Sequence, residues 1–150
     1  VWYRDLYRRV GGLGWLWFSR LEMPDDELLA ALDDPATRLW TLTRNGQAEA
    51  MLELDFREAG ECELAFFGVT PELIGKGAGR FLMDRAIELA WAKPIRRFHV
   101  HTCTLDSPGA LRFYINSGFR PTRQQIEIAP DPRLSGTLPR NAGAHVPMFE

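Results

Sequence analysis

Apolar residues at the start of the chain recur with the spacing of helices. In residues 2–10 they share one helical face, and the Gly11-Gly12 pair that follows is expected to end this helix. A second amphipathic stretch lies between Pro24 and Pro35, with aspartates after the first proline that can cap a helix. The chain is therefore expected to begin with two short helices.

The period then changes to that of β-strands. Two alternating runs in residues 37–56 flank Asn45-Gly46, the dipeptide that most readily adopts the two positive φ angles of a type I′ hairpin turn. A third strand is predicted over residues 61–69, after a turn that contains glycine. The three strands are expected to form an antiparallel meander.

A βαβ unit is predicted next. A helix over residues 78–92 connects the strand at 61–69 to another strand at 97–103, so these two strands are expected to be parallel. A further helix is marked by Ser107 as its cap and by Gly118 just after its last turn.

The last part of the chain is expected to contain one long strand and a loop. Residues 119–129 alternate and predict a strand, whereas the proline-rich residues 130–147 predict an irregular loop. Residues 145–149 could form a last short strand.

Composition places the chain among ordinary globular proteins. It has 150 residues, of which 45% are hydrophobic and 25% are charged, so we expect one domain over residues 1–150. Cys62 and Cys103 need not pair in a chain of this size, which favours a reducing, cytoplasmic location.

Charge and hydropathy argue against two classes of partner. A formal net charge of −2 disfavours a nucleic-acid binder with a broad basic face. The longest apolar stretches, near residues 13–18 and 64–69, are far shorter than the ~20 residues that a membrane helix needs. We therefore expect neither nucleic acid nor a membrane as a partner.

A glycine-rich loop between a strand and a helix is the strongest chemical signal. Gly75, Gly77 and Gly79 let the backbone approach a ligand closely, and the helix N-terminus that follows offers free N–H groups and the positive end of its dipole. Lys76 and Arg80 add local positive charge. The loop can therefore bind a diphosphate, although a simple tight connection would use the same residues.

Two familiar phosphate-binding motifs do not fit this loop. A P-loop requires Gly-x-x-x-x-Gly-Lys-Ser/Thr, but Thr70 stands at the first glycine position and Gly77 follows Lys76. A dinucleotide fingerprint requires Gly-x-Gly-x-x-Gly, whereas the glycines here are at positions 75, 77 and 79. It also requires an acidic residue about 20 positions later, where this chain has His99. The first motif is ruled out and the second is disfavoured.

A second motif lies some thirty residues further along. This motif is the run Ser107-Pro108-Gly109-Ala110-Leu111-Arg112-Phe113-Tyr114, followed by Gly118-Phe119. Taken together with the glycine loop Gly75–Gly79, it resembles the GNAT superfamily of N-acetyltransferases. The resemblance covers about residues 37–120. It implies an α/β (α+β) fold with a mixed, mostly antiparallel central sheet, one splayed parallel strand pair, and helices on both faces.

The resemblance also implies a site for acetyl-CoA. The glycine loop would hold the pyrophosphate, the pantetheine arm would pair with the strand at 61–69, and a bulge at Phe67-Gly68 would separate the parallel strands. The residues expected to contact the coenzyme are Phe67, Gly68, Val69, Ile74, Gly75, Lys76, Gly77, Ala78, Gly79, Arg80, Ser107, Ala110 and Phe113.

Three features depart from the family pattern. Ile74 replaces the polar side chain that often opens the glycine motif, so the backbone must bind the phosphates there. Ser107 replaces the usual asparagine before the second helix, although its hydroxyl can still cap. The family also begins with a strand, whereas this chain begins at the first helix and starts with Val1.

Acetyl transfer to an amine needs a base, because an alkylammonium with a pKa near 10.4 is mostly charged at pH 7. Glu63 matches the position of the general-base glutamate in the histone-modifying branch of the family, and burial is expected to raise its pKa. It is expected on the same sheet face as Phe67, although it could also be a solvated strand carboxylate. Glu53 and Glu61 are weaker alternatives that could act through water.

Tyr114 matches the tyrosine that donates a proton or a hydrogen bond to the departing CoA thiolate in many family members. A tyrosine with a pKa near 10 gives its proton to a thiol near 8.5 only at a cost of ~2 kcal/mol, so hydrogen bonding to the developing charge is the main expected contribution. Tyr114 could instead be a core aromatic residue on the inward face of its helix.

The acceptor is expected near Trp15, Trp17 and His101. The two tryptophans follow the glycines of the first helix and could form an aromatic wall or could anchor the core. His99, His101 and Cys103 alternate along one strand and could ligate zinc, but a fourth ligand is not evident. We therefore predict no metal.

Taken together, these residues predict transfer of an acetyl group from acetyl-CoA to a primary amine of a small molecule or peptide by direct attack. A non-catalytic acyl-CoA sensor and a nucleotide-binding domain are the alternatives. A strand edge left open by the absent first strand could pair with a second copy to form a homodimer.

Overall fold

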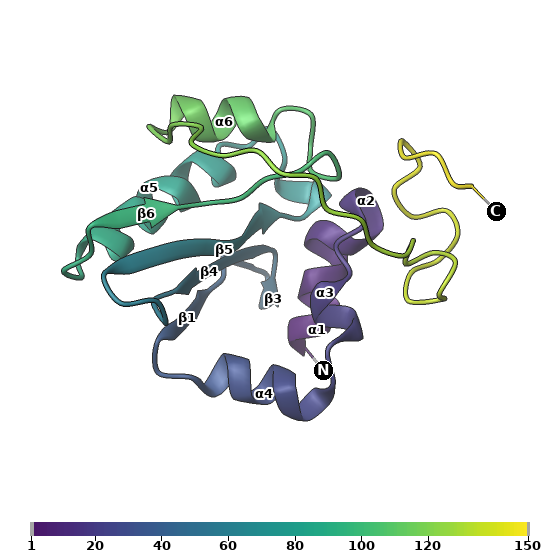
Figure 1. Ribbon diagram of the computed structural model, residues 1–150, viewed down its shortest axis with the longest axis horizontal. Helices are drawn as coiled ribbons and strands as arrows, with labels where there is room; N and C mark the ends of the chain where they lie inside the picture. Colours follow the sequence, from purple (N-terminus) through teal and green to yellow (C-terminus); the bar gives the residue numbers. More distant parts are fainter. Residues whose placement is uncertain (1, 150) are drawn as a thin grey trace.

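The computed structural model describes residues 2–149 of the chain. The central sheet has the strand order β1-β4-β5-β6, and its strands are Thr37–Trp40, Ala50–Asp55, Glu61–Val69 and Arg97–His99. β4 is antiparallel to both β1 and β5, whereas β5 and β6 are parallel. The prediction of a mixed, mostly antiparallel sheet with one parallel pair is confirmed (Figure 1).

Helices cover both faces of this sheet (Figure 1). α5 (Ala78–Trp91) and α6 (Ala110–Asn116) pack on one face, where the main apolar core lies. The other face is covered by α1 (Trp2–Tyr7), α3 (Ser19–Glu22) and α4 (Asp25–Asp33). Each aliphatic side chain buried between these layers contributes about 1.5–3 kcal/mol, so both faces stabilise the sheet.

The N-terminal helix does not end at the glycine pair, and that prediction is wrong. A π-helical turn, η1 (Arg8–Gly12), and α2 (Leu13–Trp15) continue it until Leu16, where φ is +58°. A glycine inside a helix costs only about 1 kcal/mol, which packing can offset. Here the packing is visible, because a Cβ on Gly11 would lie 2.0 Å from the Trp17 ring.

The hairpin at Asn45-Gly46 forms as predicted. β2 (Thr43–Arg44) pairs with β3 (Gln47–Ala48), and the two turn residues have φ angles of +52° and +78°. Both angles lie in the left-handed region that a type I′ turn requires.

A β-bulge interrupts β5 closer to its start than predicted. The ladder with β4 shifts after Glu53, whose partner is Phe66, so that Ala65 is an extra residue. The prediction of a bulge at Phe67-Gly68 is therefore wrong. Position 68 requires glycine for a steric reason instead, because a Cβ on Gly68 would lie 2.6 Å from the Val10 side chain of η1.

The bulge reverses which sheet face each later side chain of β5 occupies. Leu64 packs in the core beneath α5, and so does Phe67, although the two residues are three positions apart and would lie on opposite faces of a regular strand. Phe66 packs on the α1 face instead. Since neighbouring side chains alternate, Glu63 also lies on the α1 face. The prediction that it shares a face with Phe67 is wrong.

The parallel strands diverge after a short stretch of pairing. β6 was predicted over residues 97–103 but ends at His99, and it pairs with β5 only from Glu61 to Glu63. From residue 64 onward, the side of β5 that faces away from β4 has no strand partner within the described part of the chain. The expected splayed pair is therefore present.

α6 begins two positions after the predicted start, at Ala110. The Ser107 hydroxyl accepts a hydrogen bond from the Gly109 N–H at 3.4 Å, just before the helix rather than within its first turn. The helix ends at Asn116, and Gly118 with its φ of +102° lies just after the last turn, as predicted; the N–H of Phe119 closes that turn.

The strands predicted at residues 119–129 and 145–149 do not form. A strand needs a neighbour that accepts its backbone hydrogen bonds, and β6 ends before it could serve residues 119–129. This segment is extended, and Ile126 and Ile128 are more than nine-tenths exposed.

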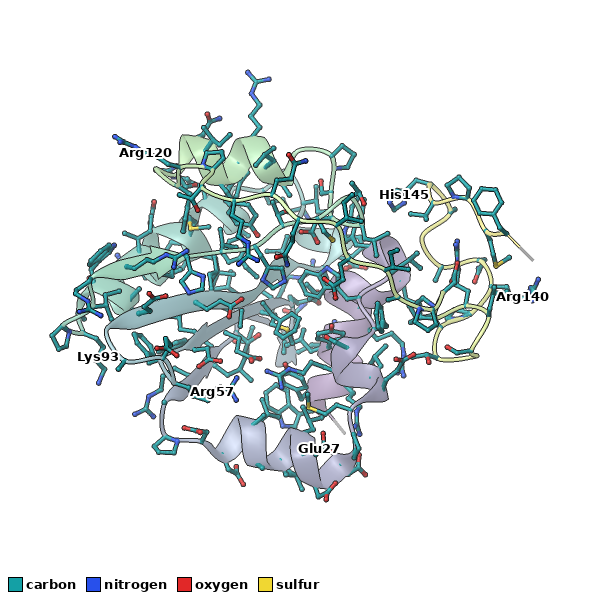
Figure 2. All side chains as sticks on the ribbon, in the orientation of Figure 1. Glu27, Arg57, Lys93, Arg120, Arg140 and His145 are labelled. Carbon is teal, nitrogen blue, oxygen red and sulfur yellow. The ribbon has the colours of Figure 1, made fainter. Side chains whose placement is uncertain are left out.

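The residues predicted as an irregular loop, 130–147, do lack helices and strands, but they are organised around one buried cation. The Arg133 guanidinium donates to the Asp131 carboxylate and to the carbonyl oxygens of Ala142 and Val146. At the edge of this loop His145, labelled in Figure 2, contacts Trp15 of α2, with ring centroids 5.2 Å apart. The loop therefore closes against the N-terminal helices.

Two further expectations can be compared with the structure. Cys62 is buried, Cys103 is exposed, and neither forms a disulfide. Among the helices of residues 2–149, none is long and apolar enough to span a bilayer.

Candidate active site

The glycine loop leads from the end of β5 to the start of α5 through one 3-10 turn, η2 (Pro71–Leu73). Gly75 and Gly77 have φ angles of +75° and +79°, which side chains other than glycine rarely adopt. A Cβ on Gly75, Gly77 or Gly79 would meet nothing within 4 Å. Residues 74–77 are exposed, so the backbone of the loop is open to a ligand. α5 begins directly after it at Ala78, and the first N–H groups of a helix have no partner within the helix.

The start of this loop is held by a buried carboxylate. The Thr70 hydroxyl donates to Glu49, and the Thr70 N–H donates to the Glu49 carbonyl at 2.9 Å. Thr70 is fully buried and Glu49 is 5% exposed. Arg44 donates to the same carboxylate at 3.4 Å. These hydrogen bonds, with that of Thr70 first, hold the pKa of Glu49 below its usual range.

Tyr114 lies on the opposite face of β5 from Glu63. Its ring is 8% exposed and packs against Phe67, Phe113 and Phe119, with ring centroids 5.8–6.3 Å apart. Burial, followed by the charge of Asp106, raises the pKa of Tyr114, so the hydroxyl stays protonated at neutral pH. No group among residues 2–149 hydrogen-bonds to this hydroxyl, which is therefore free to donate to a ligand.

Glu63 is paired with His101 across the divergence of the parallel strands. The Nδ1 atom of His101 lies 2.9 Å from Oε1 of Glu63. This hydrogen bond holds the pKa of Glu63 below its usual range, which contradicts the prediction that burial would raise it. The cause is that Glu63 is only half-buried, so the partner outweighs desolvation.

The same pair raises the pKa of His101 above its ordinary value of 6.5, chiefly through the hydrogen bond to Glu63. The ion pair therefore stabilises the folded protein fully below pH 6.5, and this contribution is lost as the pH rises through the folded-state pKa of His101. At the acid end it is lost as the pH falls through the lowered pKa of Glu63.

Replacing Glu63 with glutamine should lower the pKa of His101, because the amide carries no charge to stabilise the imidazolium. An NMR pH titration of the His101 ring would show the wild-type midpoint above 6.5 and a lower midpoint in the variant. Replacing Glu27 on α4, which is exposed (Figure 2), provides the control with no expected shift. An unchanged His101 midpoint in Glu63→Gln would show that the pair does not form in solution.

The two alternative bases have other partners. Glu53 is fully buried and accepts hydrogen bonds from Tyr3 at 2.6 Å and from Arg20 at 2.5 Å, so it serves the core. Glu61 lies 3.4 Å from both Arg97 and His99.

A cavity of about 410 Å³ opens beside Glu63 on the α1 face. Four carboxylates contribute to its walls, and in Figure 2 the label of Arg57 marks the end of the sheet at which it opens. It is lined by Asp55, Arg57, Glu58, Glu61, Glu63 and His99. The excess of carboxylates suits a cationic ligand.

His99, His101 and Cys103 do not converge. Each histidine faces its own carboxylate, and no group of three or more potential metal ligands lies together among residues 2–149.

The two tryptophans do not form one wall. Trp17 packs against Phe66 of β5 with ring centroids 5.6 Å apart, whereas Trp15 lines a separate cavity of about 230 Å³ with Val69 and Ile74. Of the residues expected to bind the acceptor, only His101 lies beside Glu63.

Sequence reasoning missed Asp106, which accepts a hydrogen bond from the Trp17 indole at 3.0 Å. The two residues are 89 positions apart, and no local pattern links them. It also missed Glu49, whose alternation with apolar residues resembled that of a surface carboxylate.

Comparison with solved structures supports the fold. The aminoglycoside acetyltransferase AAC(6′)-Iy, in complex with the bisubstrate analogue CoA-S-monomethyl-acetylneamine, superposes with a TM-score of 0.61 and 17% identity over 84% of this chain and 90% of that chain. A transcriptional regulator from Bacillus halodurans C-125 gives 0.60 and 19% over 69% and 73%. The aminoglycoside acetyltransferase meta-AAC0020 from an uncultured soil metagenomic sample, in complex with sisomicin, gives 0.57 and 16% over 73% and 75%.

Sequence comparison provides the assignment. No curated protein matches the chain. The model of the acetyltransferase (GNAT) family matches residues 3–119, which include β5, the glycine loop, α5 and α6. This range contains both motifs on which the resemblance was based. The chain therefore belongs to the GNAT family of acetyltransferases.

Proposed function

We propose that this protein is an N-acetyltransferase that transfers the acetyl group of acetyl-CoA to a primary amine of a small molecule. The observation that carries the proposal is the open glycine loop at the start of α5, directly after a strand whose outer edge has no partner. The loop can bind the diphosphate of CoA, and the free edge of β5 can pair with its pantetheine arm. Membership of the family and the CoA ligands of similar structures support this assignment.

In the proposed reaction the thioester lies at the free edge of β5, with Glu63 on one side of the sheet and Tyr114 on the other. The neutral amine attacks the carbonyl carbon from the side of Glu63, forming a C–N bond while the C–S bond breaks. Neutral His101 takes up the proton that the amine loses on its Nε2 atom, while its Nδ1 atom stays hydrogen-bonded to Glu63, which stabilises the resulting imidazolium. The Tyr114 hydroxyl donates a hydrogen bond to the sulfur as negative charge develops there.

The acceptor is proposed to be cationic. The cavity beside Glu63 is lined by four carboxylates and two basic side chains, which would attract a molecule with more than one ammonium group. The structural neighbours that carry sisomicin and acetylneamine ligands support this class.

The test is an acetylation assay with acetyl-CoA and a panel of amines. The panel contains neamine, spermidine, a lysine-containing peptide and an amine without further charge, and products are identified by the mass of one added acetyl group. Turnover of the polycationic small molecules above the others is expected. Binding of CoA without turnover of any amine would favour the alternative of a non-catalytic acyl-CoA sensor.

Replacing Thr70 with valine should weaken the binding of acetyl-CoA about three- to tenfold, because the loop loses one buried hydrogen bond at its start. Valine has nearly the same shape, so the core is preserved. Calorimetric titration would measure the change, and Thr70→Ser, which keeps the hydroxyl, is the control. Equal affinity in the valine and serine variants would show that Glu49 does not position the loop.

A further inference from the structure

The Trp17 indole covers β5 where the parallel strands have diverged. Its ring centroid lies 5.6 Å from that of Phe66, and its Cη2 atom is 3.6 Å from the position of a Cβ on Gly68. On its other side, Gly11 leaves the space that the ring occupies. Gly11 therefore makes room for the indole on the α1 face, where the ring lies within van der Waals contact distance of position 68.

Asp106 fixes this indole from the segment that follows β6. Its Oδ1 atom accepts a hydrogen bond from the Nε1–H group of Trp17 at 3.0 Å. Its Oδ2 atom accepts from the Thr102 hydroxyl at 2.6 Å and from the Cys103 N–H at 3.3 Å. The carboxylate is thus anchored to its own segment and holds a side chain that lies over the neighbouring strand.

The Trp17–Asp106 contact therefore joins the two sides of the divergence. Trp17 lies over β5, Asp106 belongs to the residues after β6, and parallel pairing between the two strands ends at Glu63. Tyr114 contacts Phe67 from the opposite face of β5. A ligand paired with the free edge of β5 would lie between the indole and the tyrosine.

We propose that Asp106 is a positioning residue, which holds the Trp17 indole across the divergence so that it contacts the acyl end of acetyl-CoA. This inference rests on the proposed function, because it requires the coenzyme to pair with β5. The indole supplies the apolar contact, and the carboxylate fixes its orientation.

The experiment follows tryptophan fluorescence and calorimetric affinity while acetyl-CoA is added. Trp17→Phe removes the indole, and Asp106→Ala removes its acceptor. Asp106→Asn retains an acceptor oxygen. The matched control is Trp91→Phe, which removes an exposed tryptophan of α5, one of the five in the chain. Thermal unfolding of each variant verifies that it is folded.

The wild-type and Trp91→Phe proteins should show the same change in fluorescence with acetyl-CoA, whereas Trp17→Phe should lose most of it. Asp106→Ala should lose it as well and bind acetyl-CoA about three- to tenfold more weakly, and Asp106→Asn should recover most of both. The double variant Trp17→Phe/Asp106→Ala should bind no more weakly than the weaker single variant, because both changes break one contact.

Two results would overturn the inference alone while leaving the proposed function in place. One is an unchanged fluorescence response in Trp17→Phe, and the other is a double variant whose loss of affinity equals the product of the single losses. The absence of any heat when acetyl-CoA is added to the wild-type protein would instead contradict the proposed function, and the inference with it.

Discussion

Replacing Tyr114 with phenylalanine is expected to lower kcat about 100-fold while the affinity for acetyl-CoA changes less than about twofold. The hydroxyl has no partner among residues 2–149, and its raised pKa keeps it protonated, so it acts only as a donor to a bound group. The ring would remain packed against Phe67 and Phe113, so the fold should not change.

Steady-state rates with an amine identified by the panel, combined with calorimetry, would measure this effect. Tyr7→Phe is the matched control, because its hydroxyl contacts Ser19 beneath α1 rather than α6. If Tyr114→Phe retained the wild-type kcat, Tyr114 would be a core aromatic with no part in the reaction.

Replacing Arg20 with methionine is expected to cost about 3–5 kcal/mol of unfolding free energy, the largest loss of stability that we predict. The substitution would leave the fully buried carboxylate of Glu53 without its cationic partner and with only the Tyr3 hydroxyl as donor. The pair joins α3 to β4, so its loss would loosen the helices on the α1 face. Urea denaturation would measure the change.

The double variant Arg20→Met/Glu53→Leu separates the charge from the packing. Because it removes both partners, it should regain most of the stability that Arg20→Met alone loses. A cost below about 1 kcal/mol for Arg20→Met would show that Glu53 is not held as a buried charge.

The elements that were predicted correctly are those that local chemistry determines. Asn45-Gly46 requires no distant partner to form its turn, and the positive φ of Gly118 ends α6 in the same way. The glycine loop before α5 was recognisable for the same reason, because Gly75 and Gly77 can adopt their positive φ angles without a distant contact.

The errors arise where a distant contact decides the structure. The helix continues through Gly11 because the Trp17 ring packs there, and residues 119–129 form no strand because β6 is too short to pair with them. The bulge at Ala65 follows from the register with β4, which the sequence of β5 alone does not reveal.

That bulge also changes the expected arrangement of the site. The catalytic candidates Glu63 and Tyr114 were predicted from matching positions; Glu63 belongs to β5 and Tyr114 packs against it from α6, so the two lie on opposite faces of the strand. The pairing of Glu63 with His101 joins β5 to the residues that follow β6, and the charged cavity joins β5 to β6 and to the end of β4, so no local pattern predicts either of them. The proposed reaction uses this arrangement, with the amine on one face and the leaving group near the other.

The most direct test of the account is a calorimetric titration of CoA into the wild-type protein and into Gly77→Val. Valine at a φ of +79° is strained by about 1–2 kcal/mol and would displace the backbone that begins α5. We predict binding to the wild-type protein and an affinity about tenfold lower in the variant. Equal affinity in the two proteins, or no heat with the wild type, would contradict the claim that this loop binds the diphosphate of the coenzyme.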